Sequence, residues 1–123
     1  MKSDRVVLKI GITSLEDYRD RTLAIVRGEL VPAPDDPKIW FTSLESLAQI
    51  LSGPNRVLLE IIRRAKPGSL KELAELSGRK QSNLNRTLHT MERYRLVRLT
   101  KRNGRVVPEV PYDKLELELS LAA

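Results

Sequence analysis

The sequence contains no cysteine and only one histidine, His89. Disulfide bonds and thiolate metal sites are therefore excluded, and so is a metal site built from several histidines. Aromatic residues make up only 4% of the chain, whereas proteins that bind single-stranded nucleic acid use several spaced aromatic side chains over a basic groove. We therefore interpret Trp40 and Phe41 as core or interface residues and not as a base-stacking platform.

Long hydrophobic runs are also missing. No run approaches the roughly 20 apolar residues that span a bilayer. The start of the chain leads into a strand-like stretch that contains Lys9, which is unlike the uninterrupted apolar core of a signal peptide. We expect a cytoplasmic protein without membrane contacts. No Gly-rich phosphate loop, carboxylate pair or nucleophile beside a general base is recognisable, so we expect neither an enzyme nor a cofactor.

What the sequence does contain is an uneven distribution of charge. Residues 54–108 carry 14 lysines and arginines against 4 acids, a net charge of +10, whereas residues 1–53 sum to −1 and residues 109–123 to −3. Such charges can simply solvate a surface, but a basic surplus confined to one segment is the electrostatic footprint of a polyanion-binding domain. The length of 123 residues suits one compact domain with extensions.

The N-terminal third predicts a strand, a helix and a linker. Residues 5–12 are rich in β-branched side chains and predict a strand. Thr13 or Ser14 can cap a following helix that ends before Gly28. Three prolines within residues 31–37 remove backbone donors, so no regular element should run through them. Trp40-Phe41 predicts a short strand.

The middle of the chain predicts two further helices separated by a break. Ser43 can cap a helix that runs to Leu51. Ser52-Gly53-Pro54 breaks it and precedes another helix, which has a regular apolar face. That helix should end at Lys66-Pro67-Gly68.

The most informative segment is residues 69–110. Ser69-Leu70-Lys71-Glu72 predicts a capping box, in which the serine caps the Glu72 N–H and the glutamate returns to the serine N–H. Ser77-Gly78 should end this short helix. A second helix is predicted over residues 81–95, with Leu84, Leu88 and Met91 on its inner face. Its outer face carries Ser82, Asn85, Arg86, His89 and Arg93.

A hairpin and a final strand follow. In residues 97–107, Asn103-Gly104 between β-formers is a strong hairpin signal because both turn residues need positive φ. In the tail, Leu115, Leu117, Leu119 and Leu121 alternate with polar residues, which is typical of a strand with one buried face. The N-terminal elements of the same subunit or those of a second subunit could cover that face.

The stretch LAELSGRKQSNLNRTL at residues 73–88, followed by Met91-Glu92 and Leu96-Val97, resembles the core of MarR- and ArsR-like winged-helix transcriptional regulators over roughly residues 54–110. The segments SLEDYRDR, WFTSLESLAQIL and VPYDKLELELSL are similar to a family of small prokaryotic predicted transcriptional regulators, some of which look like antitoxins. The sequence departs from the general winged-helix pattern at Tyr94-Arg95, where many relatives have a small residue or glycine before the Leu-Val that begins the wing.

These patterns predict an α+β winged helix-turn-helix protein. We expect an N-terminal strand-helix extension and linker at residues 1–40, a DNA-binding domain at 41–110 and a C-terminal packing or dimerisation strand at 111–123. The second helix should read bases in the major groove, while the residues before it and the hairpin tip contact phosphates or the minor groove. The candidate DNA-binding residues are Ser69, Arg79, Lys80, Gln81, Ser82, Asn83, Asn85, Arg86, His89, Lys101, Arg102 and Arg105.

The expected function is regulation of transcription, as a homodimeric repressor that binds double-stranded DNA. The alternative is a protein-interaction module, for example an antitoxin, in which residues 1–40 and the acidic tail bind a partner such as a basic toxin and DNA binding is autoregulatory. RNA binding is a third possibility, but the sequence lacks aromatic stacking residues and a recognisable RNA-binding motif. No metal site is expected, since His89 has no second histidine or cysteine to join it.

Overall fold

The computed structural model describes residues 6–121 and divides the chain into two compact units. The first, here called the sheet unit, contains the chain up to Gln49 together with the segment from Lys114 onward. The second, the helix-hairpin unit, is Ile50–Asp113. The boundaries predicted from the sequence lie at 40/41 and 110/111. The elements in chain order are β1 (Val7–Ile12), α1 (Leu15–Val26), β2 (Ile39–Phe41), α2 (Leu44–Ile50), α3 (Gly53–Ala65), α4 (Leu70–Ser77), α5 (Gln81–Arg93), β3 (Arg98–Arg102), β4 (Arg105–Glu109) and β5 (Lys114–Leu119).

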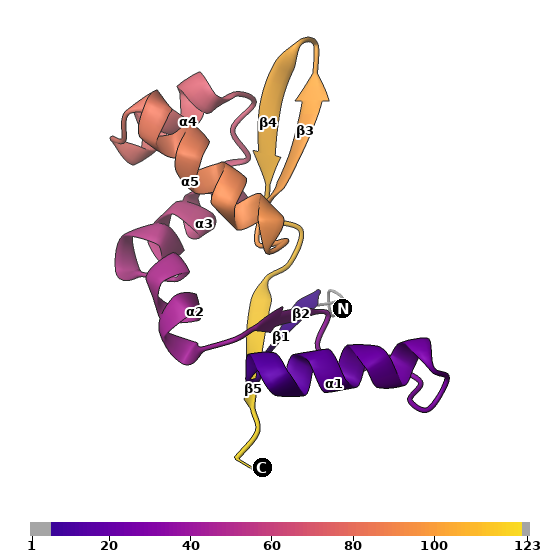
Figure 1. The fold of residues 1–123 in the computed structure, drawn as a ribbon. Helices are drawn as coiled ribbons and strands as arrows, with labels where there is room; N and C mark the ends of the chain where they lie inside the picture. Colours follow the sequence, from indigo (N-terminus) through magenta and orange to yellow (C-terminus); the bar gives the residue numbers. More distant parts are fainter. Residues whose placement is uncertain (1–5, 122–123) are drawn as a thin grey trace, which may run out of the picture. The chain divides into compact units, whose positions relative to one another are not determined.

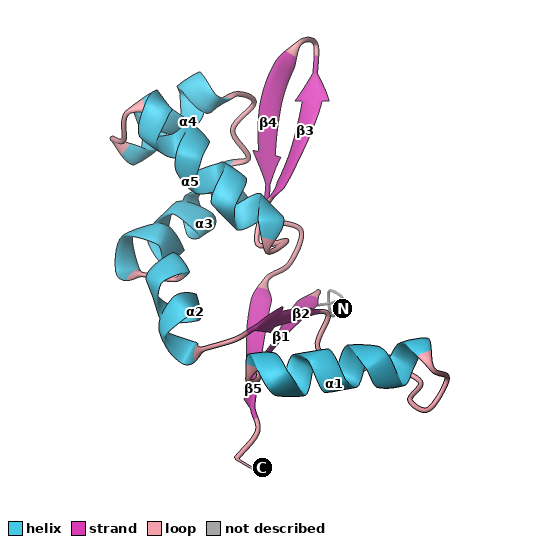
Figure 2. Ribbon diagram, in the orientation of Figure 1, coloured by secondary structure: helices cyan, strands magenta, loops and turns pink. Residues whose placement is uncertain are grey.

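The predicted α+β class is confirmed (Figures 1 and 2). Every helix and strand predicted from the sequence is present within residues 6–121, and Arg5 of the first predicted strand lies outside the described residues. Residues 31–37 contain turns but no regular element, as their prolines predict. Over residues 6–121, no helix combines the length and apolar character that crossing a bilayer would require.

The sheet unit is built on three parallel strands in the order β2-β1-β5. The first strand and the last strand of the chain therefore lie side by side, with Leu8 opposite Leu115 and Ile12 opposite Leu119. Parallel pairing requires a long connection, and here it joins segments about a hundred residues apart. Strand β5 is an edge of this sheet, with β1 as its partner.

The predicted leucine face of β5 is present but is only partly covered. Leu117 and Leu119 share a face with Ile10 and Ile12, yet they stay 52% and 51% exposed, whereas Ile10 is fully buried. Leu121 lies beyond the strand and is exposed. The expectation of one buried face is thus wrong within a single chain, because pairing with β1 satisfies the backbone of β5 without covering its side chains.

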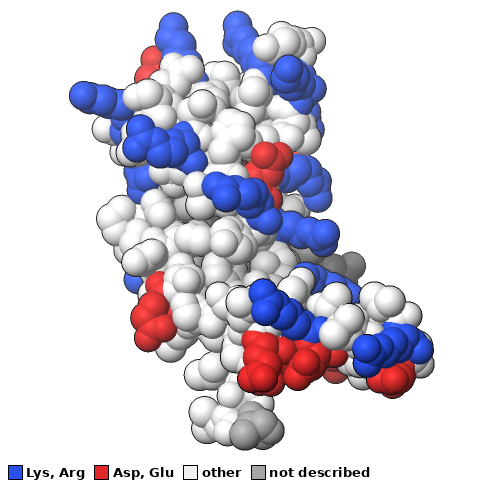
Figure 3. All heavy atoms as spheres, in the orientation of Figure 1, with Lys and Arg blue, Asp and Glu red and all other residues white. Residues whose placement is uncertain are grey.

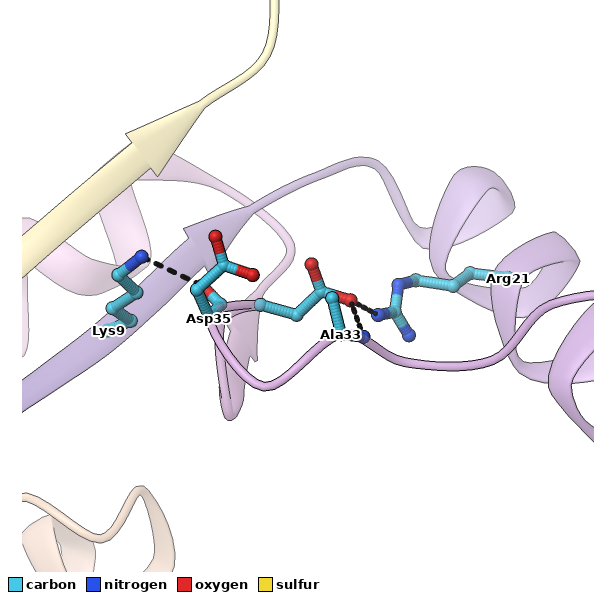
Figure 4. Close-up of polar contacts among 5 residues, drawn as sticks. Lys9, Arg21, Ala33 and Asp35 are labelled. Atoms are coloured by element: carbon cyan, nitrogen blue, oxygen red, sulfur yellow. Dashed lines mark hydrogen bonds and ion pairs between the residues drawn. The ribbon is translucent and has the colours of Figure 1, made fainter.

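On the other face of the sheet, Trp40 closes over Gly11. A Cβ added at Gly11 would come within 2.3 Å of the Trp40 ring, so glycine is needed for this close approach. The Arg21 guanidinium of α1 stacks on the same ring, 5.2 Å from its centroid. It also pairs with the Asp36 carboxylate at 3.0 Å, which accepts the Ala33 N–H as well (Figure 4). Helix α1, capped by Ser14 as predicted, has no buried residue.

In the helix-hairpin unit, α3 and α4 have the predicted starts and ends, whereas α5 starts at Gln81 as predicted but ends at Arg93 and not at residue 95. Ser52 caps α3, and the helix closes at Lys66 in the left-handed conformation. Ser69 caps α4 by accepting the Glu72 N–H at 3.1 Å. The second half of the predicted capping box is wrong. Glu72 Oε1 accepts the N–H of Gly68 at 3.1 Å. Gly68 lies one residue before the serine, so the glutamate gives a partner to a loop N–H and not to the N–H of Ser69.

Helix α5 ends in a Schellman motif with a non-glycine residue at its turn. The Leu96 N–H donates to the Met91 carbonyl and the Arg95 N–H to the Glu92 carbonyl, both at 2.9 Å. Arg95 takes φ +58°, in the left-handed region that glycine adopts without strain. The departure noted at Tyr94-Arg95 therefore falls at the turn that ends α5.

The end of the helix-hairpin unit is held by a buried tyrosine. The Tyr112 hydroxyl donates to the Leu96 carbonyl at 2.8 Å, and only 7% of Tyr112 is exposed. Burial raises the pKa of this phenol above its ordinary value of 10.0. The contact joins the chain after β4 to the turn that follows α5.

Candidate nucleic-acid interface

The outer face of α5 is a continuous polar surface. Leu84, Leu88 and Met91 are fully buried, as their spacing predicts. The predicted outward residues are exposed, and no acid occurs among them before Glu92. This surface offers amide, hydroxyl, imidazole and guanidinium groups from Gln81, Ser82, Asn83, Asn85, Arg86 and His89.

The N-terminus of α5 lacks a side-chain cap. Lys80 is the N-cap residue, and no side chain accepts the first free N–H groups of the helix. These donors and the exposed Lys80 ammonium therefore lie together at the positive end of the helix dipole. Such an end favours an anionic oxygen.

Arg79 is held in place by Asn55, which is not among the predicted candidates. Its Nη2 donates to Asn55 Oδ1 at 3.1 Å, while Asn55 Nδ2 donates to the Ile50 carbonyl at 2.9 Å. A shallow depression is lined by both residues together with Lys80 and Asn83. Asn55 thus links the start of α3 to the turn before α5 and orients a guanidinium beside the uncapped helix end.

His89 uses one ring nitrogen within its own helix. Nδ1 lies 2.7 Å from the Asn85 carbonyl oxygen. Because a carbonyl oxygen only accepts, this contact requires the proton on Nδ1 and leaves Nε2 as an acceptor. The imidazole edge at the outer face is therefore a hydrogen-bond acceptor in the neutral form.

The hairpin divides its cations between two faces. The Asn103-Gly104 turn has the two positive φ values that the sequence predicts, +52° and +76°. In the resulting register Arg102 lies directly opposite Arg105, and Lys101 lies opposite Val106 on the other face. Like charges directly opposite destabilise a strand pair. The tip therefore keeps a concentration of positive charge at a cost in local stability.

Arg102 has an acidic partner. Its guanidinium pairs with the Glu109 carboxylate at 2.9 Å, and Arg98 approaches the same carboxylate at 3.7 Å. Neither Arg98 nor Glu109 is among the candidates predicted from the sequence. The sequence does indicate that these two residues are neighbours, because a two-residue turn at 103–104 fixes the pairing of residue 98 with residue 109.

The side chain of Ser69 serves the fold, since its Oγ is the cap of α4. The remaining candidates lie on two parts of the helix-hairpin unit. Those around α5 are Arg79, Lys80 and the six outer-face residues, and those at the hairpin tip are Lys101, Arg102 and Arg105.

The charge of the helix-hairpin unit matches this concentration of cations. Residues 50–113 contain 14 lysines and arginines against 6 acids, a net charge of +8, while the rest of the chain sums to −2. Figure 3 shows lysine and arginine atoms spread over the face of this unit that carries α5 and the hairpin. Among the described residues, no three His, Cys, Asp or Glu side chains are grouped to hold a metal ion.

Comparison with known proteins gives one family. Residues 50–117, more than half of the chain, match the family model HVO_A0114. The chain belongs to the HVO_A0114 family. The match covers the whole helix-hairpin unit of this HVO_A0114 protein and the first residues of β5. No curated protein and no solved structure matches the chain.

Proposed function

We propose that this HVO_A0114 protein is a winged helix-turn-helix regulator of transcription that binds double-stranded DNA. Helices α4 and α5 would form the helix-turn-helix, and the hairpin β3–β4 would be the wing. The observation that carries the proposal is the combination, in one unit of net charge +8, of an acid-free polar helix face with a basic hairpin. The resemblance of residues 73–97 to MarR- and ArsR-like regulators agrees with it.

In this proposal the two cationic groups have different tasks. The outer face of α5 enters the major groove, where arginine pairs with guanine and asparagine or glutamine with adenine. Arg79, Lys80 and the uncapped N–H groups of α5 contact phosphates and fix the register. Lys101 and Arg105 of the wing contact the backbone or a narrow minor groove. Arg102 can contact DNA in the same way only when its ion pair with Glu109 is broken.

The protein would act in the cytoplasm as a homodimeric repressor. One winged helix covers about one half-site, so useful specificity generally requires two copies. The half-exposed Leu117 and Leu119 beside the free edge of β5 are the surface we assign to the second copy. An inverted repeat with half-site centres about one helical turn apart, or a multiple of it, is the expected operator.

A second candidate function follows from the sheet unit. Helix α1 buries none of its residues, and Leu15, Leu23 and Val26 are exposed on it. In an antitoxin or other interaction module, this surface would bind a partner protein and DNA binding would be autoregulatory. Co-purification of the neighbouring gene product, abolished in a Leu15→Lys, Val26→Lys variant, would support this alternative.

The salt dependence of binding tests the proposed function. DNA selected from a random pool is titrated by fluorescence anisotropy at salt concentrations between roughly 50 and 200 mM. If about 6 to 10 phosphates are contacted per dimer, the slope of log affinity against log salt should be roughly −5 to −9. A flat response would remove the DNA hypothesis.

Matched charge variants localise the binding surface. Arg79→Ala, Lys80→Ala should weaken binding and make the slope less steep by roughly 1 for each phosphate that is no longer neutralised. Arg19→Ala, Arg27→Ala removes the same charge from the sheet unit and should leave affinity within about twofold. Equal weakening in both variants would mean that only net charge matters.

A further inference from the structure

The helix-hairpin unit contains a cavity of about 800 Å³ whose lining shares only Arg102 and Arg105 with the proposed DNA contacts. It lies between the C-terminal end of α3, the loop after it and one face of the hairpin. Its lining contains no residue of α4 or α5. The volume falls in the range of small-molecule sites, roughly 300 to 1,000 Å³.

The cavity wall is strongly basic. Five cationic residues line it against one acid, Glu109. The register of the hairpin explains three of them, because Arg98, Arg102 and Arg105 share a face with Glu109. The other two, Arg63 and Lys66, come from the end of α3.

Only part of this charge is neutralised. Glu109 pairs with Arg98 and Arg102. Within residues 6–121, no ion pair is found for Arg63, Lys66 or Arg105. The end of α3 contributes roughly −0.5 charge from its dipole, which opposes an anion. That partial charge and Glu109 together are still far smaller than five positive charges.

The cavity lining also includes accessible apolar residues, and this feature distinguishes a ligand site from a phosphate contact. Val110 is partly exposed and Pro111 is exposed, whereas the lining residues Ile62, Pro67, Val107 and Pro108 are buried. A duplex carries its phosphates on the outside of a stiff cylinder and so contacts the outer edge of a cavity and not its interior. Apolar residues beside cationic ones instead suit a small molecule with an apolar body and anionic groups.

We propose that this cavity binds a small organic polyanion with two or more carboxylate or phosphate groups. The anionic groups contact Arg63, Lys66 and Arg105, and the apolar body lies on Val110 and Pro111. Because Arg105 also belongs to the wing, occupancy withdraws it from the DNA backbone and lowers DNA affinity. This last effect rests on the proposed function, whereas binding itself does not.

The site is tested first without DNA, on the full chain. Benzene-1,3,5-tricarboxylate is titrated and followed by amide chemical shifts, with the neutral benzene-1,3,5-tricarboxamide and inorganic phosphate as comparisons. We expect saturable tricarboxylate binding that shifts the amides of Lys66, Gly68 and Gly104. Phosphate, which lacks an apolar body, should bind at least tenfold more weakly.

Two charge-matched variants decide between a site and general attraction. Arg63→Gln, Lys66→Gln should weaken tricarboxylate binding at least tenfold. Arg64→Gln, Lys71→Gln removes the same charge from exposed positions outside the cavity and should change it less than twofold. Equal weakening, equally tight binding of the tricarboxamide, or no saturation by about 10 mM would overturn the proposal.

The coupling to DNA is measured separately at constant ionic strength. Tricarboxylate at ten times its dissociation constant should lower DNA affinity at least fivefold, and Arg63→Gln, Lys66→Gln should abolish this effect. Binding without any change in DNA affinity would overturn the coupling but not the site. A protein that binds tricarboxylate and no DNA would refute the proposed function alone.

Discussion

The Arg79 guanidinium donates to the Asn55 side-chain oxygen across 24 residues of sequence. Arginine in a turn is ordinarily mobile, and ordering it during binding would cost conformational entropy. Here the Arg79 side chain is already ordered in the folded protein before binding, since Asn55 is itself fixed by the Ile50 carbonyl. The contact therefore preorganises one cation beside the uncapped start of α5.

This relationship predicts coupling between the two residues in DNA binding. Asn55→Ala should lower the affinity for specific and random DNA alike by about 1 kcal/mol, the value of a typical hydrogen bond. Since Asn55 acts through Arg79, the double variant with Arg79→Ala should lose no more affinity than Arg79→Ala alone. Additive effects in an anisotropy-based double-mutant cycle would show that Asn55 acts by another route.

Base readout and phosphate positioning should separate between α5 and the wing. Arg86→Ala should cost roughly 1 to 3 kcal/mol on the selected site and relax preference at one base pair. Arg105→Ala should weaken binding to specific and random DNA alike, because backbone contacts carry no sequence information. If both variants reduce both kinds of binding equally, α5 is not the reader.

The exposed leucines of β5 should form the dimer interface. Leu117→Lys, Leu119→Lys places charge on the sheet face beside the free edge and should yield a folded monomer in sedimentation at micromolar concentration. Leu15→Lys, Val26→Lys, on the exposed side of α1, is the matched variant and should remain dimeric. The opposite result would move the interface to α1. A wild-type monomer with undiminished operator affinity would exclude the dimer altogether.

Tyr112 should make stability depend on pH in the alkaline range. Because burial raises the pKa of this phenol, the unfolded chain loses the proton at lower pH than the folded one. The stabilisation is therefore complete below about pH 10, the ordinary tyrosine pKa, and is lost progressively above it.

Tyr112→Phe isolates this effect from the titration of lysines. At pH 7 the variant should be less stable by about 1 to 2 kcal/mol, since it leaves the Leu96 carbonyl without its donor. Between about pH 9 and 11 the wild type should lose more unfolding free energy than the variant does, as measured by urea denaturation. Parallel curves would argue against a buried neutral phenol.

The turn at Arg95 predicts a preference for glycine. At φ +58° an L-residue costs roughly 1 to 2 kcal/mol, and glycine avoids this at an entropic cost of about 0.5 to 1 kcal/mol. Arg95→Gly should therefore be more stable than Arg95→Ala by up to about 1.5 kcal/mol in chemical denaturation. If alanine is the more stable of the two, the left-handed turn is not maintained in solution.

Local patterns in the sequence predicted the helices and strands. The features that could not be predicted depend on contacts between residues far apart in the sequence. Ser52, Ser69 and Gly78 mark helix ends because a cap acts within a few residues of itself. The partner of β5 was not predictable, since alternating leucines specify a face but not a neighbouring strand. Likewise, nothing near Arg79 in the sequence indicates Asn55.

The stacking of Arg21 on Trp40 has an experimental consequence. Trp40 is the only tryptophan in the chain, and it belongs to the sheet unit. Its emission therefore monitors the unfolding of that unit alone, whereas far-ultraviolet circular dichroism reports mainly on the helices of the other. Recorded together during denaturation, the two signals show whether the units melt as one cooperative body or in two separate transitions.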